Sequence, residues 1–182
     1  VGPEAWAETP RQRAADWLRS APVSALKPAL RERSADVRAT AAARLAENRA
    51  RASSAVPELT KALDDEDPIV RGLAALALRE AGAAALPALD RLAARLKDPD
   101  VGVRMMSANA IGALGSKAGT AVAALTEVCR VPSEHVHVLR SVAWALGEIG
   151  PAAAEAIPAL EELKKIPRVR LAAEAAIKQI RR

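Results

Sequence analysis

The chain has 182 residues, of which 51% are hydrophobic, and a formal net charge of +5. Phe and Tyr are absent, so the core must pack small side chains at close spacing instead of using aromatic fillers. A single cysteine excludes an internal disulfide, and no apolar run approaches the roughly 20 residues that span a bilayer, so no membrane insertion is predicted. The mild basic excess forms no dense block, which disfavours nucleic acid as a partner.

Helix-forming residues dominate the chain, and almost no stretch alternates with a period of two residues, so the fold is predicted to be all-α. Residues 1–24 are predicted to form a divergent capping helix or a partial repeat that contains Trp6 and Trp17. The first five residues look like residues 149–153, which lie between two later helical segments. We therefore expect the chain to be part of a longer protein.

From residue 25 onward, a pair of helical segments recurs five times. The second segment of each pair begins with a valine, and these valines are separated by 33, 33, 35 and 31 residues. Apolar residues at the first and ninth positions, with small residues near the fifth and eighth, place one tightly packed face on each helix. The valines predicted to be buried are Val37, Val70, Val103, Val138 and Val169. The predicted units are residues 25–54, 55–84, 85–118, 119–154 and 155–182.

Turn and cap residues mark the ends of these segments. Prolines fall in first turns, where a missing N–H has little effect on the helix. Short polar residues in the turns are placed to cap the second helix of a unit, and glycines are placed to end it. The prolines are Pro57, Pro87 and Pro158; the caps are Ser34, Asp67 and Asp100; the glycines are Gly82, Gly115 and Gly150.

The combined pattern, a proline-led helix, an Asp-rich turn and then V-R-x-x-A-A-x-A-L-G-x-I-G, resembles HEAT repeats. It is most similar to the bacterial kind that is also found in phycobilin lyases, and the resemblance covers about residues 25–182. It implies a right-handed α-solenoid of about five HEAT-like helical hairpins plus an N-terminal helix. First helices would lie on the convex side and second helices on the concave side. The motif is specific for the fold and nearly silent on function.

The arginine that follows the motif valine is predicted to be structural rather than phosphate-binding. In the second and third units it lies four residues after the turn aspartate, so the two side chains can meet on one helix. The resemblance implies that such arginines bridge to the turn aspartate of a neighbouring unit. The fourth unit carries Leu139 in this position, which should interrupt the series. The predicted ladder comprises Arg38, Asp67, Arg71, Asp100, Arg104 and Arg170.

The stretch CRVPSEHVHVLR, residues 129–140, holds the single cysteine and both histidines. Cys129, Glu134 and His137 could converge on a metal ion, but the set is incomplete for a zinc site. The preferred interpretation is an ordinary turn with Ser133 as helix cap, and neither a metal nor a cofactor is predicted. No His-Glu pair occurs anywhere, which excludes the related di-iron enzyme deoxyhypusine hydroxylase.

Function is predicted to lie on the exposed face of the second helices, where apolar side chains occupy positions that a solvated face would give to Lys and Glu. The alternative is that about half of these side chains lean between helices and fill the core. The predicted partner-binding residues are Leu73, Leu76, Met105, Met106, Asn109, Arg140, Trp144, Glu148 and Leu171.

We therefore predict a non-catalytic protein-protein interaction scaffold that binds a protein or peptide segment in its concave groove. One alternative is a bilin-lyase-type enzyme, in which the groove holds a tetrapyrrole. Another is nucleic-acid binding through a basic face. The sequence identifies neither the partner nor the cellular compartment.

Overall fold

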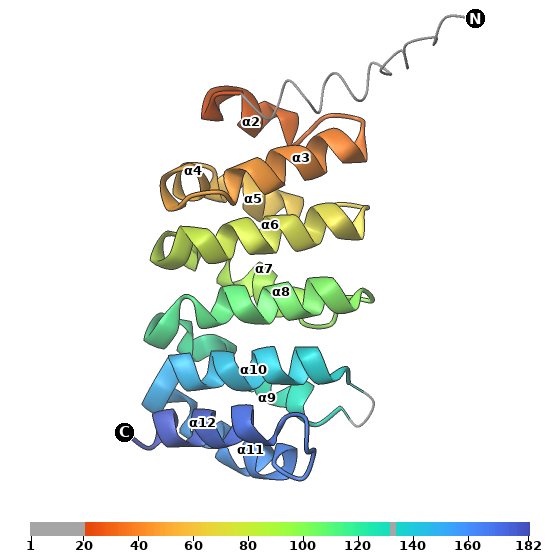
Figure 1. Cartoon of the computed structure of the whole chain (residues 1–182). Coiled ribbons are helices and arrows are strands. Elements are labelled where there is room, and N and C mark those ends of the chain that lie inside the picture. The colour runs from red at the N-terminus through yellow and green to blue at the C-terminus, as the bar shows by residue number, and fades with distance from the viewer. Residues whose placement is uncertain (1–20, 132–133) are drawn as a thin grey trace, which may run out of the picture.

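A computed structural model describes residues 21–131 and 134–182. Within these ranges all regular structure is helical and no strand occurs. The helical units are stacked along one axis, and their helices form two layers that run side by side along it (Figure 1). The predicted all-α solenoid of HEAT-like hairpins is confirmed. Residues 1–20 of the predicted capping segment, with Trp6 and Trp17, lie outside the described residues.

The second layer consists of one helix per unit. Neighbours in this layer pack directly on one another, α6 on α3 and α8, and α10 on α8 and α12. Alanines at the contacts allow the helix axes to approach closely. All five motif valines are between 0% and 8% exposed, as predicted. The helices are α3 (Ala35–Leu45), α6 (Pro68–Ala81), α8 (Val101–Gly112), α10 (Val136–Ile149) and α12 (Arg170–Ile180).

The first layer is more broken than a simple hairpin predicts. In four units a short helix precedes the main one, and Pro57 and Pro158 lie in the first turn of the main helix. A proline ring clashes with the carbonyl group four residues before it and disfavours a helical conformation in the preceding residue, which favours a helix break just before these two prolines. Pro87 lies inside the preceding 3-10 segment instead. The segments are α2 (Val23–Ala29), α4 (Arg49–Ser54), α5 (Val56–Ala62), η1 (Gly82–Ala88), α7 (Leu89–Arg95), η2 (Gly115–Ala121), α9 (Val122–Cys129), η3 (Gly150–Ala156) and α11 (Ile157–Leu163).

The helix ends agree with most of the predicted caps. The carboxylate of Asp67 accepts a hydrogen bond from the Ile69 N–H at 2.7 Å, and that of Asp100 accepts one from the Val103 N–H at 3.0 Å. Ser34 is at the N-cap of α3, but its side chain makes no capping hydrogen bond. The three predicted glycines have φ between 57° and 73°, a region that side chains with a Cβ rarely adopt.

The start of α10 differs from the prediction. Its N-cap is His135, whose ring nitrogen accepts a hydrogen bond from the His137 N–H at 3.3 Å. The predicted cap, Ser133, lies outside the described residues. No helix in the described ranges has the length and apolar content that crossing a membrane requires.

Candidate functional site

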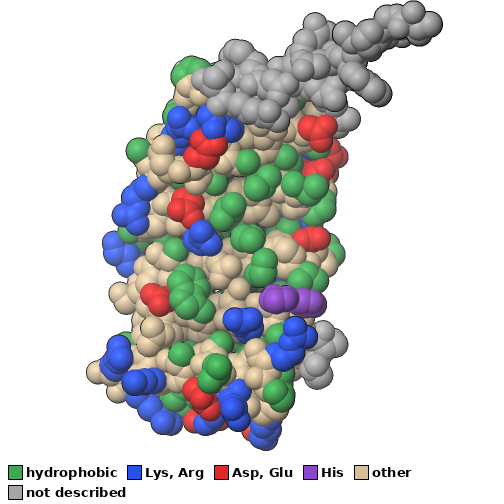
Figure 2. Space-filling view, in the orientation of Figure 1, with side chains coloured by type: hydrophobic (Ala, Val, Ile, Leu, Met, Phe, Trp, Pro, Cys, Tyr) green, Lys and Arg blue, Asp and Glu red, His purple; other side chains and the backbone are tan. Residues whose placement is uncertain are grey.

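The outward side of α3, α6, α8, α10 and α12 forms one continuous surface, which we call the second-helix face. It is turned toward the viewer in Figures 1 and 2. Hydrophobic side chains gather over its middle, and Lys and Arg side chains lie mainly along one edge and at the C-terminal end (Figure 2). Side chains of these helices line the hollows described next, among the residues that the structure describes.

The first hollow lies between α6 and α8 and has a volume of about 270 Å³. Ile69, in the first turn of α6, is 64% exposed at this hollow. Leu73, Leu76 and Met106 are half-buried, and Leu73 and Met106 pack against the core. The hollow is therefore an apolar depression with a rigid floor. Its lining comprises Pro68, Ile69, Gly72, Leu73, Leu76, Asp100, Gly102, Val103 and Met106.

The second hollow has a volume of about 500 Å³ and draws side chains from four helices of the stack. One wall is the indole of Trp144, which is 40% exposed. The ring lies directly over Gly112 of α8, where an added Cβ would come within 2.5 Å of the Trp144 Cζ3 atom. Gly112 thus allows the indole to lie flat against the preceding helix. The lining comprises Arg49, Arg79, Glu80, Asn109, Ala113 and Trp144.

The second hollow carries one unbalanced positive charge. Arg79 donates two hydrogen bonds to the neighbouring carboxylate of Glu80, at 2.6 and 3.0 Å, so these two charges offset each other. Arg49 forms no hydrogen bond or ion pair with any residue in the described part of the chain. Its guanidinium lies beside Gly82, with the Nη2 atom 2.9 Å from where a Cβ would be.

The structure distributes the predicted face residues unevenly. Leu73, Leu76 and Met106 line the first hollow, and Asn109 and Trp144 line the second. Met105 is half-buried and packs against the core, as the core-filling alternative predicts. Three exposed residues lie on the same helices without lining either hollow. They are Arg140, Glu148 and Leu171.

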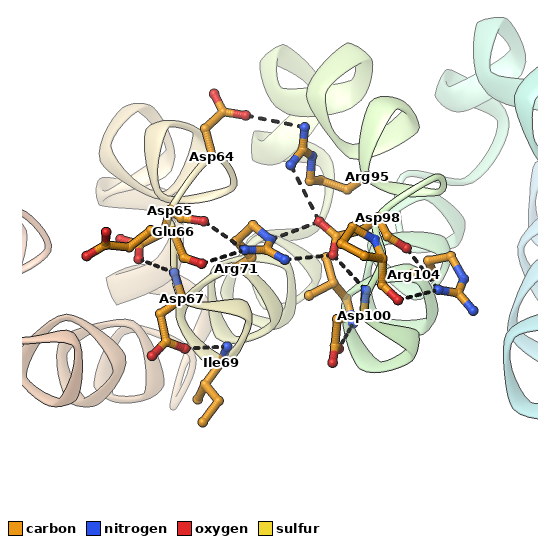
Figure 3. A network of polar contacts seen from close by, with 12 residues as sticks. Asp64, Asp65, Glu66, Asp67, Ile69, Arg71, Arg95, Asp98, Asp100 and Arg104 are labelled. Carbon is orange, nitrogen blue, oxygen red and sulfur yellow. Dashed lines mark hydrogen bonds and ion pairs between the residues drawn. The ribbon is translucent and has the colours of Figure 1, made fainter.

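A polar ladder joins neighbouring units at the turns that precede the second helices (Figure 3). Arg71 of α6 donates from Nε and Nη2 to the carboxylate of Asp98 in the next unit, both at 2.8 Å. Its Nη1 donates to the carbonyl oxygens of Asp65 and Glu66 in its own turn. Each guanidinium therefore holds its own turn and the following one together. The equivalent pairs are Arg38 with Asp65 and Arg104 with Glu134.

Hydrogen bonds within the ladder stabilise the charged forms of Asp65, Asp98 and Arg71. Burial by itself would raise the pKa of Asp98, but hydrogen bonds from Arg71 and from the Asp100 N–H lower it below the usual range. Burial by itself would also raise the pKa of Asp65, but hydrogen bonds from Arg38 and from the Asp67 N–H lower it. The hydrogen bonds to Asp98 raise the pKa of Arg71. All three groups are charged at neutral pH.

The expected pairing along a single helix is not what the structure shows. Asp67 and Asp100 act as helix caps, while Arg71 and Arg104 use their Nε and Nη2 groups to reach acids of the following unit. The reason is geometric. Each cap carboxylate is already turned toward backbone N–H groups at the helix start, whereas the acids of the next turn face the planar guanidinium with both oxygens.

The last two units end the ladder. Leu139 occupies the arginine position of the fourth unit and is 3% exposed. The Arg170 side chain is 61% exposed, and its nearest acid is Glu174 on the same helix at 4.0 Å. Arg170 therefore does not join neighbouring units.

The irregular stretch at residues 129–140 contributes to the ladder. The Glu134 carboxylate accepts from the Arg104 Nε and Nη2 groups at 3.0 and 2.8 Å. Burial raises the pKa of the Cys129 thiol to about 12, and the two histidine rings stack with centroids 5.2 Å apart. In residues 21–131 and 134–182, no three His, Cys, Asp or Glu side chains are grouped as metal ligands would be. Glu134 is thus engaged in the ladder.

Several residues of these sites were missed by sequence reasoning. Asp65 and Asp98, the acceptors of the ladder, each lie two residues before a predicted cap, and their spacing of 33 residues matches the repeat. The 33-residue periodicity of these two aspartates could therefore have identified them as ladder residues from the sequence. Arg49 and Arg79 of the second hollow had none, because they stand at unrelated positions of different units and meet only in the stack.

Comparisons with known proteins agree with this architecture. The family model for HEAT repeats matches residues 23–95 and 89–178. No curated protein matches the sequence significantly. Among solved structures, the complex of CpcE and CpcF of the phycocyanin lyase from Nostoc is 27% identical, with a TM-score of 0.76. The match covers 99% of this chain and 69% of that one.

Two engineered structures share the fold. A designed armadillo repeat protein in complex with the peptide (KR)4 is 22% identical over 93% of this chain and 86% of that one, with a TM-score of 0.73. Another engineered protein is 22% identical over 94% and 90%, also with a TM-score of 0.73. With the repeat motif, the two-layer stack and the family match in agreement, the chain belongs to the HEAT repeat family.

Proposed function

We propose that this chain is a non-catalytic protein-interaction module that binds a segment of a partner across the second-helix face. The observation that carries the proposal is the first hollow, where Ile69, Leu73 and Met106 present apolar surface to solvent around a depression of about 270 Å³. Exposed helix positions normally carry charged side chains, and a clustered apolar depression is typical of a recognition surface.

The packing beneath this hollow favours binding. Val103 at its floor is fully buried, so the depression exists before a partner arrives and little conformational entropy is lost on binding. Met106 adds an unbranched, polarisable side chain that can adapt to partners of different shape. Burying one large aliphatic side chain contributes about 1.5–3 kcal/mol, so side chains inserted in the hollow would supply part of the binding free energy and contacts along the rest of the face would add to it.

The chemistry of the hollows supports binding rather than catalysis. The titratable group in the first hollow is Asp100, whose carboxylate caps α8. The second hollow holds two guanidinium groups, a carboxylate already paired with one of them, and an amide. Neither lining combines a nucleophile with a base within hydrogen-bond reach, which is the arrangement that acyl or glycosyl transfer requires.

The solved structures that share the fold are consistent with this role. The designed armadillo repeat protein was solved with a bound peptide, and CpcE and CpcF were solved as a complex of two proteins. Both observations belong to those proteins. They support the proposal because a stacked repeat fold offers the same long helical surface in each case.

A random 12-residue peptide library displayed on phage, selected on the purified chain, tests the proposal. We expect enriched peptides whose binding weakens at least tenfold with Ile69→Gln. Ile69 is exposed, so the variant should fold, which a circular dichroism melt checks. The matched control is Leu86→Gln, which removes an exposed leucine of η1 outside both hollows and should change binding less than twofold. No enrichment, or equal binding to Ile69→Gln, would refute the proposal.

A bilin-lyase-type activity is a second candidate, supported by the similarity to the phycocyanin lyase complex. In that case the second-helix face would hold a linear tetrapyrrole. Incubation of the chain with a bilin should then give a shifted absorption band that persists through gel filtration. An unchanged spectrum of free bilin would remove this candidate.

A further inference from the structure

We propose that the second hollow is a carboxylate-recognition site, which selects partner segments carrying an acidic residue close to an apolar one. The inference rests on the proposed function, because it assigns the chemistry of the segment that the second-helix face binds. The apolar side chain occupies the first hollow, and the Asp or Glu side chain enters the second. Arg49 is the cation that receives it.

The charges around the second hollow are complementary to an anion. Arg79 and Glu80 offset each other, and Arg49 has no partner in the described part of the chain. Arg49 is exposed and its guanidinium lies beside Gly82, and a guanidinium without an acceptor can take a carboxylate through two parallel hydrogen bonds. A lysine-rich or arginine-rich segment would instead bring like charges together at this place.

Asn109 and Trp144, which also line the second hollow, suit an Asp or Glu side chain with its carboxylate and its aliphatic carbons. The side chain of Asn109 is half-buried and forms no hydrogen bond with any described residue, so its amide is available as a donor. The indole of Trp144 is fixed over Gly112 and presents its outer surface to the hollow. An aliphatic side-chain stem can pack on that ring while its carboxylate reaches Arg49.

The spacing of the hollows defines the spacing of the recognised residues. Leu73 and Glu80 are seven residues apart on α6, and Met106 and Ala113 are seven apart on α8. At about 1.5 Å of rise per residue, the hollows lie about 10 Å apart along the helix axes. A segment in the polyproline II conformation covers that distance in about three residues at roughly 3.1 Å each, and its three residues per turn place the side chains of the first and fourth residues on the same side. The recognised pattern is therefore an apolar residue followed or preceded at the third position by Asp or Glu.

One acidic residue near the site limits where the segment runs. Glu148 is exposed one turn after Trp144 on α10, lies outside the lining of the second hollow and has no partner in the described part of the chain. Its charge disfavours an acidic group on that side and leaves the Arg49 side as the favourable one. Glu148→Gln should leave binding of an acidic peptide unchanged or tighten it.

The peptides enriched from the same phage library test this inference. We expect an Asp or Glu three residues from an apolar residue. In a synthetic copy of the best peptide, replacing that acid by its amide should weaken binding about tenfold or more, and Arg49→Gln in the chain should do the same. The change in the peptide leaves the protein unaltered, so a folding defect cannot explain a loss of binding in that experiment. The control Arg168→Gln removes another exposed charge without a partner and should change binding less than twofold.

The possible outcomes separate the two proposals. Peptides that need Ile69 but show no acidic residue, or that bind Arg49→Gln normally, would overturn the carboxylate site and leave the proposed function standing. Equal weakening by Arg49→Gln and Arg168→Gln, with binding seen only at low salt, would indicate general attraction to anions such as nucleic acid and would also overturn it. A complete failure of enrichment would refute the proposed function together with this inference.

Discussion

The guanidinium of Arg71 and the carboxylate of Asp98 form a bidentate ion pair between neighbouring repeats, with both hydrogen bonds at 2.8 Å. The Asp98 side chain is fully buried, and that of Arg71 is 10% exposed. The pair therefore links the turn of one unit to the second helix of the unit before it, at a place where water cannot replace either partner.

Asp98→Asn should strongly destabilise the array. The change leaves a buried guanidinium without a compensating charge, and breaking such a pair by removing one partner lowers the free energy of unfolding by about 3 kcal/mol. Chemical denaturation followed by circular dichroism measures the effect. The control is Glu127→Gln, which removes the exposed pair with Lys97 and should change stability by no more than about 0.5 kcal/mol. Similar losses in the two variants would contradict the prediction.

Stability should depend on pH in the acid range because of the ladder. The pKa values of Asp65 and Asp98 are lowered in the folded state, so both groups contribute stability that is fully present above the ordinary aspartate pKa of about 3.9. That contribution is lost as the pH falls through the lowered folded-state values. Urea unfolding at pH 7, 4 and 3 should show a decline that is shallower in Asp98→Asn. Parallel pH profiles would argue against the ladder as its source.

Gly112→Ala should destabilise the contact between α8 and α10. A Cβ there would lie 2.5 Å from the Trp144 ring and 2.9 Å from the Cα of Ala145. Overpacking of this kind lowers stability by about 1–3 kcal/mol and outweighs the gain of roughly 1 kcal/mol in helix propensity. The control is Gly72→Ala, whose nearest contact is 4.0 Å away and which should be neutral or stabilising. Thermal melts of the two variants should shift in opposite directions or differ clearly.

Trp144→Ala tests whether the indole mainly fills the core or mainly binds a partner. The ring is 40% exposed but rests on Gly112, so we expect a loss of about 2 kcal/mol, less than the 3–5 kcal/mol of a fully buried aromatic. Binding of the enriched peptides should weaken as well, because one wall of the second hollow is removed. A large fall in melting temperature with unchanged peptide binding would take Trp144 out of the site.

Ser107→Ala should stabilise the chain by up to about 1 kcal/mol. The Ser107 hydroxyl is fully buried and has no hydrogen-bond partner among the described residues, so its removal relieves an uncompensated desolvation cost. The matched control is Thr126→Val, which removes a buried hydroxyl that donates to the Val122 carbonyl at 2.8 Å. Denaturation midpoints should rise for the first variant and fall for the second.

The sequence by itself determined the repeat, the all-α fold and the identity of the buried helix faces. These features are encoded within single helices, since the period of the apolar positions shows which side of a helix must leave water. It also indicated which side would remain exposed, and therefore that Leu73, Met106 and Trp144 would lie on one face.

Only the tertiary structure decided which side chains from different units meet. The acid that pairs with Arg104 is Glu134, 30 residues later, and the stack brings it to the same place that Asp98 takes beside Arg71. The second hollow likewise joins Arg49, Asn109 and Trp144. Such contacts depend on the rise and rotation between units, and a local sequence pattern contains neither quantity. The sequence thus specifies each helix, while the sites between helices arise from their stacking.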